Sequence, residues 1–407
     1  MTRPVPAVHT AVPRRILPVI VFSQFAGTSL WFAVNAIMPD LQAAWGWPAA
    51  SVGTLTSAVQ MGFVLGTLAF ALLMVADRFS PRKVFVLCAL LGAALNALLV
   101  LADGNFQLAL LLRFGVGFLL AGVYPVGMKI AASWYRQGLG AAMGVLIGAL
   151  AFGTSLPHGL RALTDWASAS GNAGLGFSWQ AVVLGVSAIA ALGGLATYWL
   201  VPDSPHAAKG ARITPKALGL IWHDRKLRAS VFGYFGHMWE LYTVFVLAPF
   251  IVATRMQGAW VSLGAFVMIG SGAIGCIAGG LLARRFGSAR VAAVQLGTSG
   301  LCCLLAPVML GAPLPLFGLW LLVWGITVAG DSPQFSTLTA QNAPPAMVGS
   351  VLTLSNSIGF ALTVVSIELF VRTLPASSLA ALLPWLALGP VMGLWMLRPL
   401  WRAPHPA

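Results

Sequence analysis

Residues 76–83 read ADRFSPRK, and residues 283–290, about half a chain length later, read ARRFGSAR. Each of these charged stretches lies between two long apolar segments. A second related pair has nearly the same separation, because residues 121–125 read AGVYP and residues 329–333 read AGDSP. Repeated helical units with a site between them are typical of membrane proteins built from two similar halves. The sequence therefore predicts two copies of one membrane unit.

The composition indicates that most of the chain is surrounded by lipid. Hydrophobic residues make up 59% of the 407 residues, charged residues only 8%, and the mean hydropathy is +0.89. A soluble domain carries about 25% charged residues. A chain of this length cannot bury so much apolar surface in water. Continuous apolar runs longer than barrel strands argue against membrane strands.

Twelve apolar segments are long enough to cross a bilayer as helices. They lie near 16–38, 51–75, 84–102, 106–132, 139–163, 179–201, 229–253, 261–283, 291–311, 314–333, 348–372 and 378–398. The sequence thus predicts an all-α membrane protein with twelve transmembrane helices in two pseudo-symmetric six-helix bundles. We expect bundles over residues 1–201 and 229–407, joined by a polar, basic linker over residues 202–228.

The net charge of +14 is distributed along the loops that flank the apolar segments. Most of the 23 Lys and Arg lie on one side when the N-terminus is placed in the cytoplasm. This positive-inside pattern predicts that both termini are cytoplasmic. We also expect a multi-pass protein of a bacterial inner membrane. Charge spread in this way argues against a nucleic-acid partner. The basic linker is expected to meet anionic lipid headgroups.

At the first charged stretch, the chain resembles the major facilitator superfamily, whose loop between helices two and three reads G-x-x-x-D-R-x-G-R-R/K. The charged positions of that loop are matched by Asp77, Arg78, Arg82 and Lys83. Leu73 and Ser80 replace its two glycines. The resemblance implies a gating loop that forms ion pairs across the cytoplasmic ends of helices. A role in membrane topology alone is the alternative.

A second motif is similar to the family's fourth-helix pattern R-x-x-x-G-x-x-x-A/G, here formed by Arg113, Gly117 and Ala121. The resemblance implies that Arg113 takes part in proton or substrate coupling. Residues 156–159 read LPHG where drug–proton antiporters have a Gly-Pro signature. This departure disfavours a multidrug exporter, and the chain is loosely similar to bacterial nitrate/nitrite- or cyanate-porter-like members.

Glu240 is the most unusual residue of the apolar segments, because it lies near the middle of the seventh. A charge at this depth costs at least about 2.5–3.5 kcal/mol, so such residues usually face a cavity or a partner. His237 lies three positions earlier, on the same helix face. We expect a His237–Glu240 pair that binds and releases a proton, with Trp239 stacking on a planar solute. A purely structural pair is the alternative.

Other polar residues of the apolar segments are further candidates for a binding site. Arg113, His158 and Arg161 lie towards one face and could line a path for an anion, although Arg161 could instead sit in water at the outer mouth. Asp331, in the tenth segment, could bind a proton or pair with a cation. Tyr124 is a candidate hydrogen-bonding group of a pocket.

The sequence shows no signature of an enzyme. It has no phosphate-binding Gly-Lys-Ser/Thr loop, no zinc-ligand spacing and no nucleophile elbow, so we expect no cofactor and no metal. We predict a monomeric secondary active transporter that takes up a small polar solute, with an anion as one option, together with protons. An exporter of drugs or metabolites is the alternative within transport. A membrane sensor or a lipid-handling protein is the alternative outside it.

Overall fold

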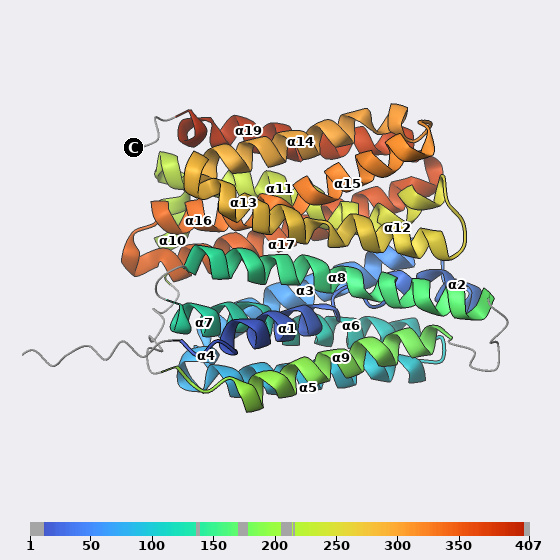
Figure 1. The fold of residues 1–407 in the computed structure, drawn as a ribbon, viewed down its shortest axis with the longest axis horizontal. Coiled ribbons are helices and arrows are strands. Elements are labelled where there is room, and N and C mark those ends of the chain that lie inside the picture. Colours follow the sequence, from blue (N-terminus) through green and yellow to red (C-terminus); the bar gives the residue numbers. More distant parts are fainter. Residues whose placement is uncertain (1–11, 136–138, 170–177, 205–213, 215, 403–407) are drawn as a thin grey trace, which may run out of the picture.

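A computed structural model describes residues 12–135, 139–169, 178–204, 214 and 216–402. These residues form helices and connecting segments, and no strand occurs among them. Eleven described helices or helix pairs are long and apolar enough to cross a membrane, and α1 (Ile16–Thr28) is a shorter apolar helix. The predicted all-α membrane fold is therefore confirmed (Figure 1).

The N-terminal half consists of the elements up to residue 200. Its helices are α1, α2 (Met38–Trp45), α3 (Ser51–Leu72), α4 (Val75–Arg78), α5 (Pro81–Ala97), α6 (Phe106–Leu120), α7 (Tyr124–Trp134), α8 (Leu139–Ala169) and α9 (Trp179–Leu200). Short 3-10 segments cover Asn35–Ile37 and Leu98–Leu101. A short helix, α10 (Lys216–His223), lies within the predicted linker, whose last residues already belong to α11.

The C-terminal half repeats this arrangement in outline. Its helices are α11 (Arg225–Ala253), α12 (Ala259–Gly270), α13 (Gly272–Phe286), α14 (Ser288–Met309), α15 (Leu314–Gly330), α16 (Ser332–Asn342), α17 (Val348–Thr373), α18 (Leu379–Leu382) and α19 (Leu388–Trp401). Its 3-10 segments are Pro345–Met347, Leu374–Ala376 and Leu383–Ala387. Figure 1 shows the two halves as stacked groups of roughly parallel rods, with α8 and α17 near the boundary between them.

The two ends of the helix bundle contain different loops and short helices. The end with α4, α7, α10 and α16 is here called the loop end, because the charged stretch 76–83 lies there; α2 and the start of α12 lie at the opposite end (Figure 1). Helix α8 packs against α12 and α13, and α3 packs against α17. Glycines allow these approaches: a Cβ atom on Gly159 would lie 2.9 Å from the Phe266 ring, and one on Gly53 would lie 3.0 Å from Val371.

Two membrane-crossing helices are broken at matching places in the repeats. Between α6 and α7 the helix is interrupted at residues 121–123, and between α15 and α16 it is interrupted at Asp331. Pro125 and Pro333 follow these breaks. Proline lacks the backbone N–H that would continue the helical bonding. Helical bonding is therefore interrupted at corresponding places in the two repeats.

The bounds of two predicted segments were wrong. The segment predicted over 16–38 is interrupted at residues 29–34, so α1 is too short to cross a membrane as one helix. The segment predicted to end near residue 333 continues through α16 to Asn342. In both cases a helix break interrupts a long apolar stretch, and apolar length alone does not reveal it.

We expect Gly275→Ala to destabilise the fold by about 1–3 kcal/mol or more, because it overpacks a helix contact. A Cβ atom at this position of α13 would collide with the backbone carbonyl oxygen of Ile326 in α15. Gly280→Ala on the same helix is the matched control, because nothing lies within 4 Å of its added Cβ. The control should stabilise the helix by about 0.5–1 kcal/mol. Thermal unfolding in detergent measures both, and equal melting temperatures would contradict this packing.

Candidate functional site

A small cavity of about 30 Å³, here called the central cavity, lies between the two halves. Its walls come from α7 and α8 on one side and from α11, α13, α15, α16 and α17 on the other. It is lined by Tyr124, Ile147, Leu150, Ala151, Tyr234, Met238, Leu241, Tyr242, Phe245, Cys276, Ala329, Ser332 and Phe360. This lining contains no charged side chain and three tyrosines. Tyr124, a candidate pocket residue from the sequence, is one of the residues that line it.

One wall of the central cavity is a stack of aromatic rings that joins the halves. Trp31 stacks on Tyr242 and Phe360, with ring centroids 5.8 Å and 5.4 Å apart. Phe32 stacks on Tyr242 at 5.9 Å with an interplanar angle of 7°. Trp31 and Phe32 belong to the interruption after α1, and their partners belong to α11 and α17. Such pairs contribute about 0.5–1.5 kcal/mol each beyond the area that they bury.

Arg113 lies outside this cavity and is buried in the N-terminal half. Its Nη1 donates to Asn96 Oδ1 at 2.9 Å, and its Nη2 donates to the carbonyl oxygens of Leu30 and Trp31 at 3.0 Å and 2.7 Å. Carbonyl groups at the end of a helix lack intrahelical partners. Arg113 therefore donates to backbone carbonyl oxygens where the first segment is interrupted. It does not line the central cavity, where the predicted anion contact would lie.

His237 and Asp331 form a buried pair inside the C-terminal half. The His237 Nδ1 lies 2.8 Å from the Asp331 Oδ1, and both side chains are at most 1% exposed. This distance fits an ion pair. The His237 Nε2 has no hydrogen-bond partner among the described residues. Asp331 stands at the break between α15 and α16, next to two elements that line the central cavity.

Glu240 has a separate set of partners. Its Oε1 accepts from Ser299 Oγ at 2.5 Å and from Trp324 Nε1 at 2.8 Å, and the Cys303 thiol lies 3.2 Å away. These donors come from α14 and α15, within the C-terminal half. Glu240 therefore connects α11 to α14 and α15 through one carboxylate oxygen.

The predicted pairing of His237 with Glu240 is wrong. Three residues along an α-helix turn the side chain by about 300°, so the two side chains point in directions about 60° apart. Each therefore meets different neighbours, Asp331 for His237 and Ser299 with Trp324 for Glu240. The two deep acids predicted from the sequence are both buried, but in two distinct sites.

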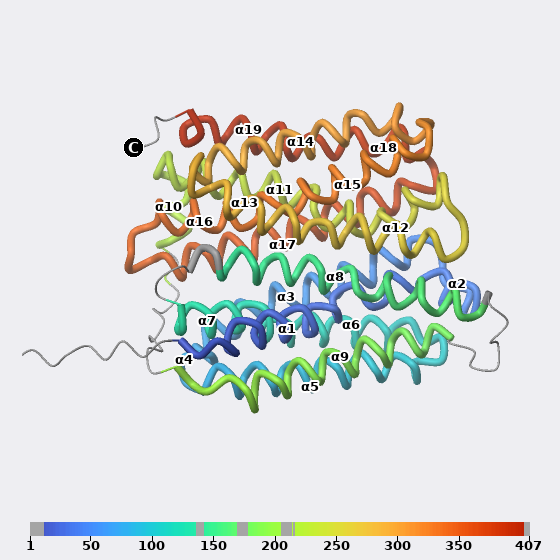
Figure 2. Tube along the Cα trace, in the orientation of Figure 1, coloured from blue at the N-terminus to red at the C-terminus, as the bar shows by residue number. Residues whose placement is uncertain are grey.

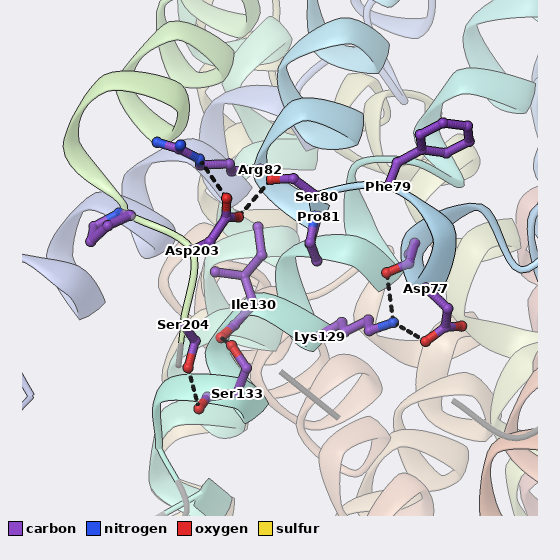
Figure 3. A pocket seen from close by; sticks show the side chains of 12 residues that line it. Asp77, Phe79, Ser80, Pro81, Arg82, Lys129, Ile130, Ser133, Asp203 and Ser204 are labelled. Atoms are coloured by element: carbon purple, nitrogen blue, oxygen red, sulfur yellow. Dashed lines mark hydrogen bonds and ion pairs between the residues drawn. The ribbon is translucent and has the colours of Figure 1, made fainter. Parts of the chain in front are cut away.

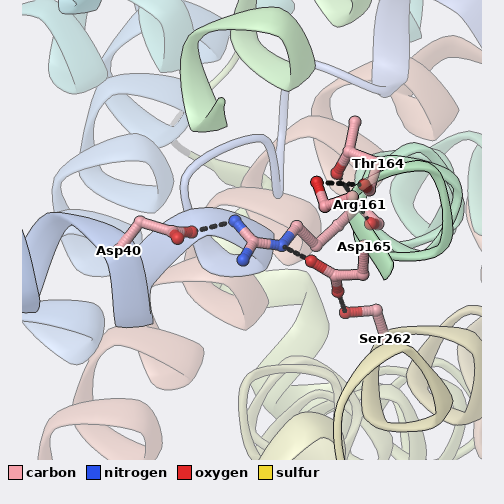
Figure 4. Close-up of polar contacts among 6 residues, drawn as sticks. Asp40, Arg161, Thr164, Asp165 and Ser262 are labelled. Atoms are coloured by element: carbon pink, nitrogen blue, oxygen red, sulfur yellow. Dashed lines mark hydrogen bonds and ion pairs between the residues drawn. The ribbon is translucent and has the colours of Figure 1, made fainter. Parts of the chain in front are cut away.

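Arg161 lies at the opposite end of the bundle, in contacts that differ from the predicted anion path (Figure 4). Its guanidinium pairs with Asp40 of α2, and its Nε donates to Asp165 Oδ1 at 2.8 Å. Asp165 Oδ2 in turn accepts from Ser262 of α12 at 3.3 Å. This chain of contacts links the N-terminal half to the C-terminal half. The alternative position at a mouth of the bundle fits Arg161 better.

Two more predicted residues lie away from the cavity lining. His158 is buried in α8, and its Nε2 has no hydrogen-bond partner among the described residues. Trp239 lies in α11, and its ring meets Phe370 edge-on with centroids 6.3 Å apart. It does not line the central cavity. The planar surface predicted for Trp239 is instead supplied there by tyrosines and Phe360.

The charged stretch at the loop end forms two groups of contacts around a cavity of about 280 Å³ (Figure 3). Asp77 pairs with Lys129 of α7 at 2.5 Å. Asp203 accepts from Ser80 at 2.6 Å and pairs with Arg82 at 3.2 Å. Arg78 and Lys83 of the same stretch are exposed. Sequence reasoning missed Asp203 and Lys129 as partners, although Asp203 directly follows the first bundle.

The sequence matches the family model of the Major Facilitator Superfamily over residues 20–367, so the chain belongs to this superfamily. The membership indicates a membrane transporter rather than an enzyme. No curated protein matches the sequence. Among the described residues, no group of three or more His, Cys, Asp and Glu could hold a metal ion.

Solved transporter structures share the fold at low sequence identity. A variant of the nucleoside transporter NupG has a TM-score of 0.70 at 15% identity, with 94% of this chain and 99% of that chain covered. The human organic anion transporter MFSD10 (TETRAN) has a TM-score of 0.69 at 18% identity, with 94% of this chain and 99% of that chain covered. The proton:xylose symporter XylE bound to 6-bromo-6-deoxy-D-glucose has a TM-score of 0.72 at 14% identity, with 95% of this chain and 94% of that chain covered. These likenesses concern the fold.

Proposed function

We propose that the protein is a secondary active transporter that moves a small solute by alternating access and couples this movement to protons. The observation that carries the proposal is the buried His237–Asp331 pair at a helix break, beside a cavity between the two halves. Buried ionisable groups in a membrane bundle are typical of proton and substrate pathways. Discontinuous helices at the interface of two repeats are typical of transporter binding sites.

The cavity has room for about one water molecule, so a solute enters only after the halves move apart. The residues that line it favour a small, uncharged solute with a planar part. Aromatic faces provide stacking surfaces, and the hydroxyls of Tyr124, Tyr234 and Ser332 can hydrogen-bond polar groups. A charged solute would need an opposite charge in the lining, and the described lining has none. The anionic option considered from the sequence therefore has less support than a neutral polar solute.

The His237–Asp331 pair can hold a proton without a large electrostatic cost. A protonated imidazole with an ionised carboxylate is neutral overall, and so is a neutral imidazole with a protonated carboxyl group. A single uncompensated charge at this depth would cost several kcal/mol. A second proton would give the pair a positive charge, so we expect that proton to bind only when water enters the cavity from one side of the membrane. Proton binding that depends on the side to which the cavity opens is the physical basis that we propose for coupling.

Other features remain predictions from the sequence. These are the cytoplasmic position of both termini, the bacterial inner membrane, the monomeric state, the domain bounds, the gating role of residues 76–83 and the kinship with nitrate/nitrite- or cyanate-porter-like members. An exporter would use the same buried pair with proton movement in the opposite sense to solute movement.

Solute exchange in proteoliposomes tests the transport proposal. Vesicles of purified protein are preloaded with one unlabelled solute from a panel of nucleosides, sugars, vitamins, organic acids and hydrophobic cations, and uptake of the labelled solute is followed. We expect counterflow with a neutral, partly planar solute. Counterflow only with organic acids would contradict the neutral solute class. No counterflow with any solute, from protein that unfolds cooperatively on heating, would contradict the transport proposal.

We expect Tyr124→Phe to raise the KM for the solute by about 3–10-fold and to leave stability unchanged. Loss of one neutral hydrogen bond costs about 0.5–1.5 kcal/mol. Tyr198→Phe is the matched control, because Tyr198 is exposed on α9 and does not line the central cavity. Equal KM values for the two variants, measured in the exchange assay, would exclude Tyr124 from solute binding.

A further inference from the structure

A groove of about 1190 Å³ lies between α14 and α19 at the loop end of the C-terminal half. Figure 2 shows these two helices side by side along the edge of the bundle. The groove is lined by Arg290, Ala293, Val294, Val391, Leu394, Trp395, Arg398, Trp401 and Arg402. It is separate from the central cavity and from the contacts of residues 76–83.

The groove begins where the close packing of the two helices ends. Further towards the opposite end, a Cβ atom on Gly300 would lie 2.7 Å from Pro390, and one on Gly393 would lie 2.9 Å from Leu296. One turn nearer the loop end, Ala293 and Val294 line the groove instead. The small residues thus hold the helices together along one part of their length and leave a hollow beyond it.

Three exposed arginines surround the groove at its loop end. Arg290 lies in the first turn of α14, Arg398 in the last turn of α19, and Arg402 directly after α19. None of the three has an ion-pair partner among the described residues, and the lining contains no acid. The start of α14 adds the partial positive charge of a helix N-terminus. Guanidinium groups match the geometry of phosphate oxygens.

The wall beyond the arginines is apolar and exposed. Val294 is 67% exposed, Val391 is 59% exposed and Trp395 is 61% exposed. A neighbouring hollow of about 250 Å³ on α19 shares Trp395 and Arg398 and adds Arg225 and Arg228. Positive charge at the end of an apolar, membrane-facing wall is the arrangement that an anionic phospholipid requires.

We propose that this groove binds an anionic phospholipid, with its phosphate between Arg290, Arg398 and Arg402 and an acyl chain along Val294, Val391 and Trp395. A free phosphate ion would use the arginines but leave the apolar wall uncovered. A zwitterionic lipid carries a cationic group that three arginines repel. The proposal does not rest on the transported solute or on proton coupling.

Native mass spectrometry of the full-length protein in detergent tests the charge part of the proposal. The protein is titrated with dioleoyl phosphatidylglycerol or with dioleoyl phosphatidylcholine. We expect the wild type to prefer phosphatidylglycerol by about tenfold or more, and Arg290→Gln/Arg398→Gln to lose about tenfold in affinity for it. Arg284→Gln/Arg285→Gln is the matched control with the same change in charge, and it should keep wild-type affinity. Equal affinity of the wild type for both lipids would overturn the proposal, as would equal losses in the two double variants.

A second pair of variants tests the apolar wall without changing charge. Val294→Trp should fill the groove and lower the affinity for phosphatidylglycerol several-fold. Val308→Trp, at a position of α14 that is 65% exposed and outside the groove, is its control. Unchanged binding to Val294→Trp would mean that the arginines attract lipid only as surface charge, and would overturn the groove as a site. Thermal unfolding of each variant shows that the loss of lipid does not come from misfolding.

Discussion

Asp331→Asn should abolish the solute accumulation that a pH gradient drives, by about 100-fold or more, while exchange of solute across the membrane continues. The asparagine amide has nearly the shape of the carboxyl group but cannot take up a proton, so the His237 pair loses one of its two charge-neutral arrangements. Positioned proton-transfer groups contribute factors of about 10²–10⁴. Proteoliposomes with an imposed pH gradient measure accumulation, and counterflow measures exchange.

Glu368→Gln provides the matched control for this experiment. Glu368 is an acid of the C-terminal half as well, but it pairs with Arg372 one helical turn away on α17 and does not line the central cavity. The Glu368→Gln variant should accumulate solute to the wild-type level. If Asp331→Asn also accumulates solute like the wild type, the pair does not carry the coupled proton.

Glu240→Gln tests the proton role predicted for Glu240 from the sequence. The amide oxygen can still accept from Ser299 and Trp324, so the local contacts persist. Loss of gradient-driven accumulation with preserved exchange would support a second proton site at Glu240. Unchanged accumulation would restrict Glu240 to holding α14 and α15 against α11.

Arg113→Leu should destabilise the protein by about 3 kcal/mol or more. The substitution leaves three buried acceptors without their donor: Asn96 Oδ1 and the carbonyl oxygens of Leu30 and Trp31. Each unsatisfied buried group costs about 1–3 kcal/mol. The effect should extend to the aromatic stack, because Trp31 belongs to both sets of contacts. Thermal unfolding in detergent measures the loss.

Arg255→Leu is the control for this substitution. Arg255 is exposed, and within the described part of the chain its guanidinium donates only to the Leu310 carbonyl. Its removal should therefore change stability by less than about 1 kcal/mol. If Arg113→Leu has the melting temperature of Arg255→Leu but no longer exchanges solute, the structural role of Arg113 is contradicted. That result would instead support a role of Arg113 in solute binding or transport.

The sequence predicts the fold well because its strongest signals are local. Continuous apolar length predicts the transmembrane helices, and the repeats at 76–83 and 283–290 predict two related halves. The motifs at 121–125 and 329–333 locate two helix breaks, because proline prevents continuous helical bonding. The break after α1 has no such marker. It depends on Arg113, which satisfies carbonyl groups more than eighty positions earlier in the chain.

The candidate site is harder to predict, because its contacts join residues that lie far apart in the sequence. Unusual depth in an apolar segment identifies His237, Glu240 and Asp331 as important, and all three are buried. Spacing on one helix suggests that His237 meets Glu240, but their partners come from α14, α15 and the break before α16. Contacts between helices decide which ionisable groups pair. Spacing along one helix cannot show how its neighbours pack.

The most direct test of the central claim is solute-dependent proton movement in proteoliposomes. A pH-sensitive dye inside vesicles of purified protein is followed while the solute identified by counterflow is added outside, without any imposed gradient. We predict acidification or alkalinisation of the lumen that requires the solute, occurs in the wild type and is absent in Asp331→Asn. Solute exchange at normal rate with no change in internal pH in the wild type would contradict proton coupling and the role of the His237–Asp331 pair.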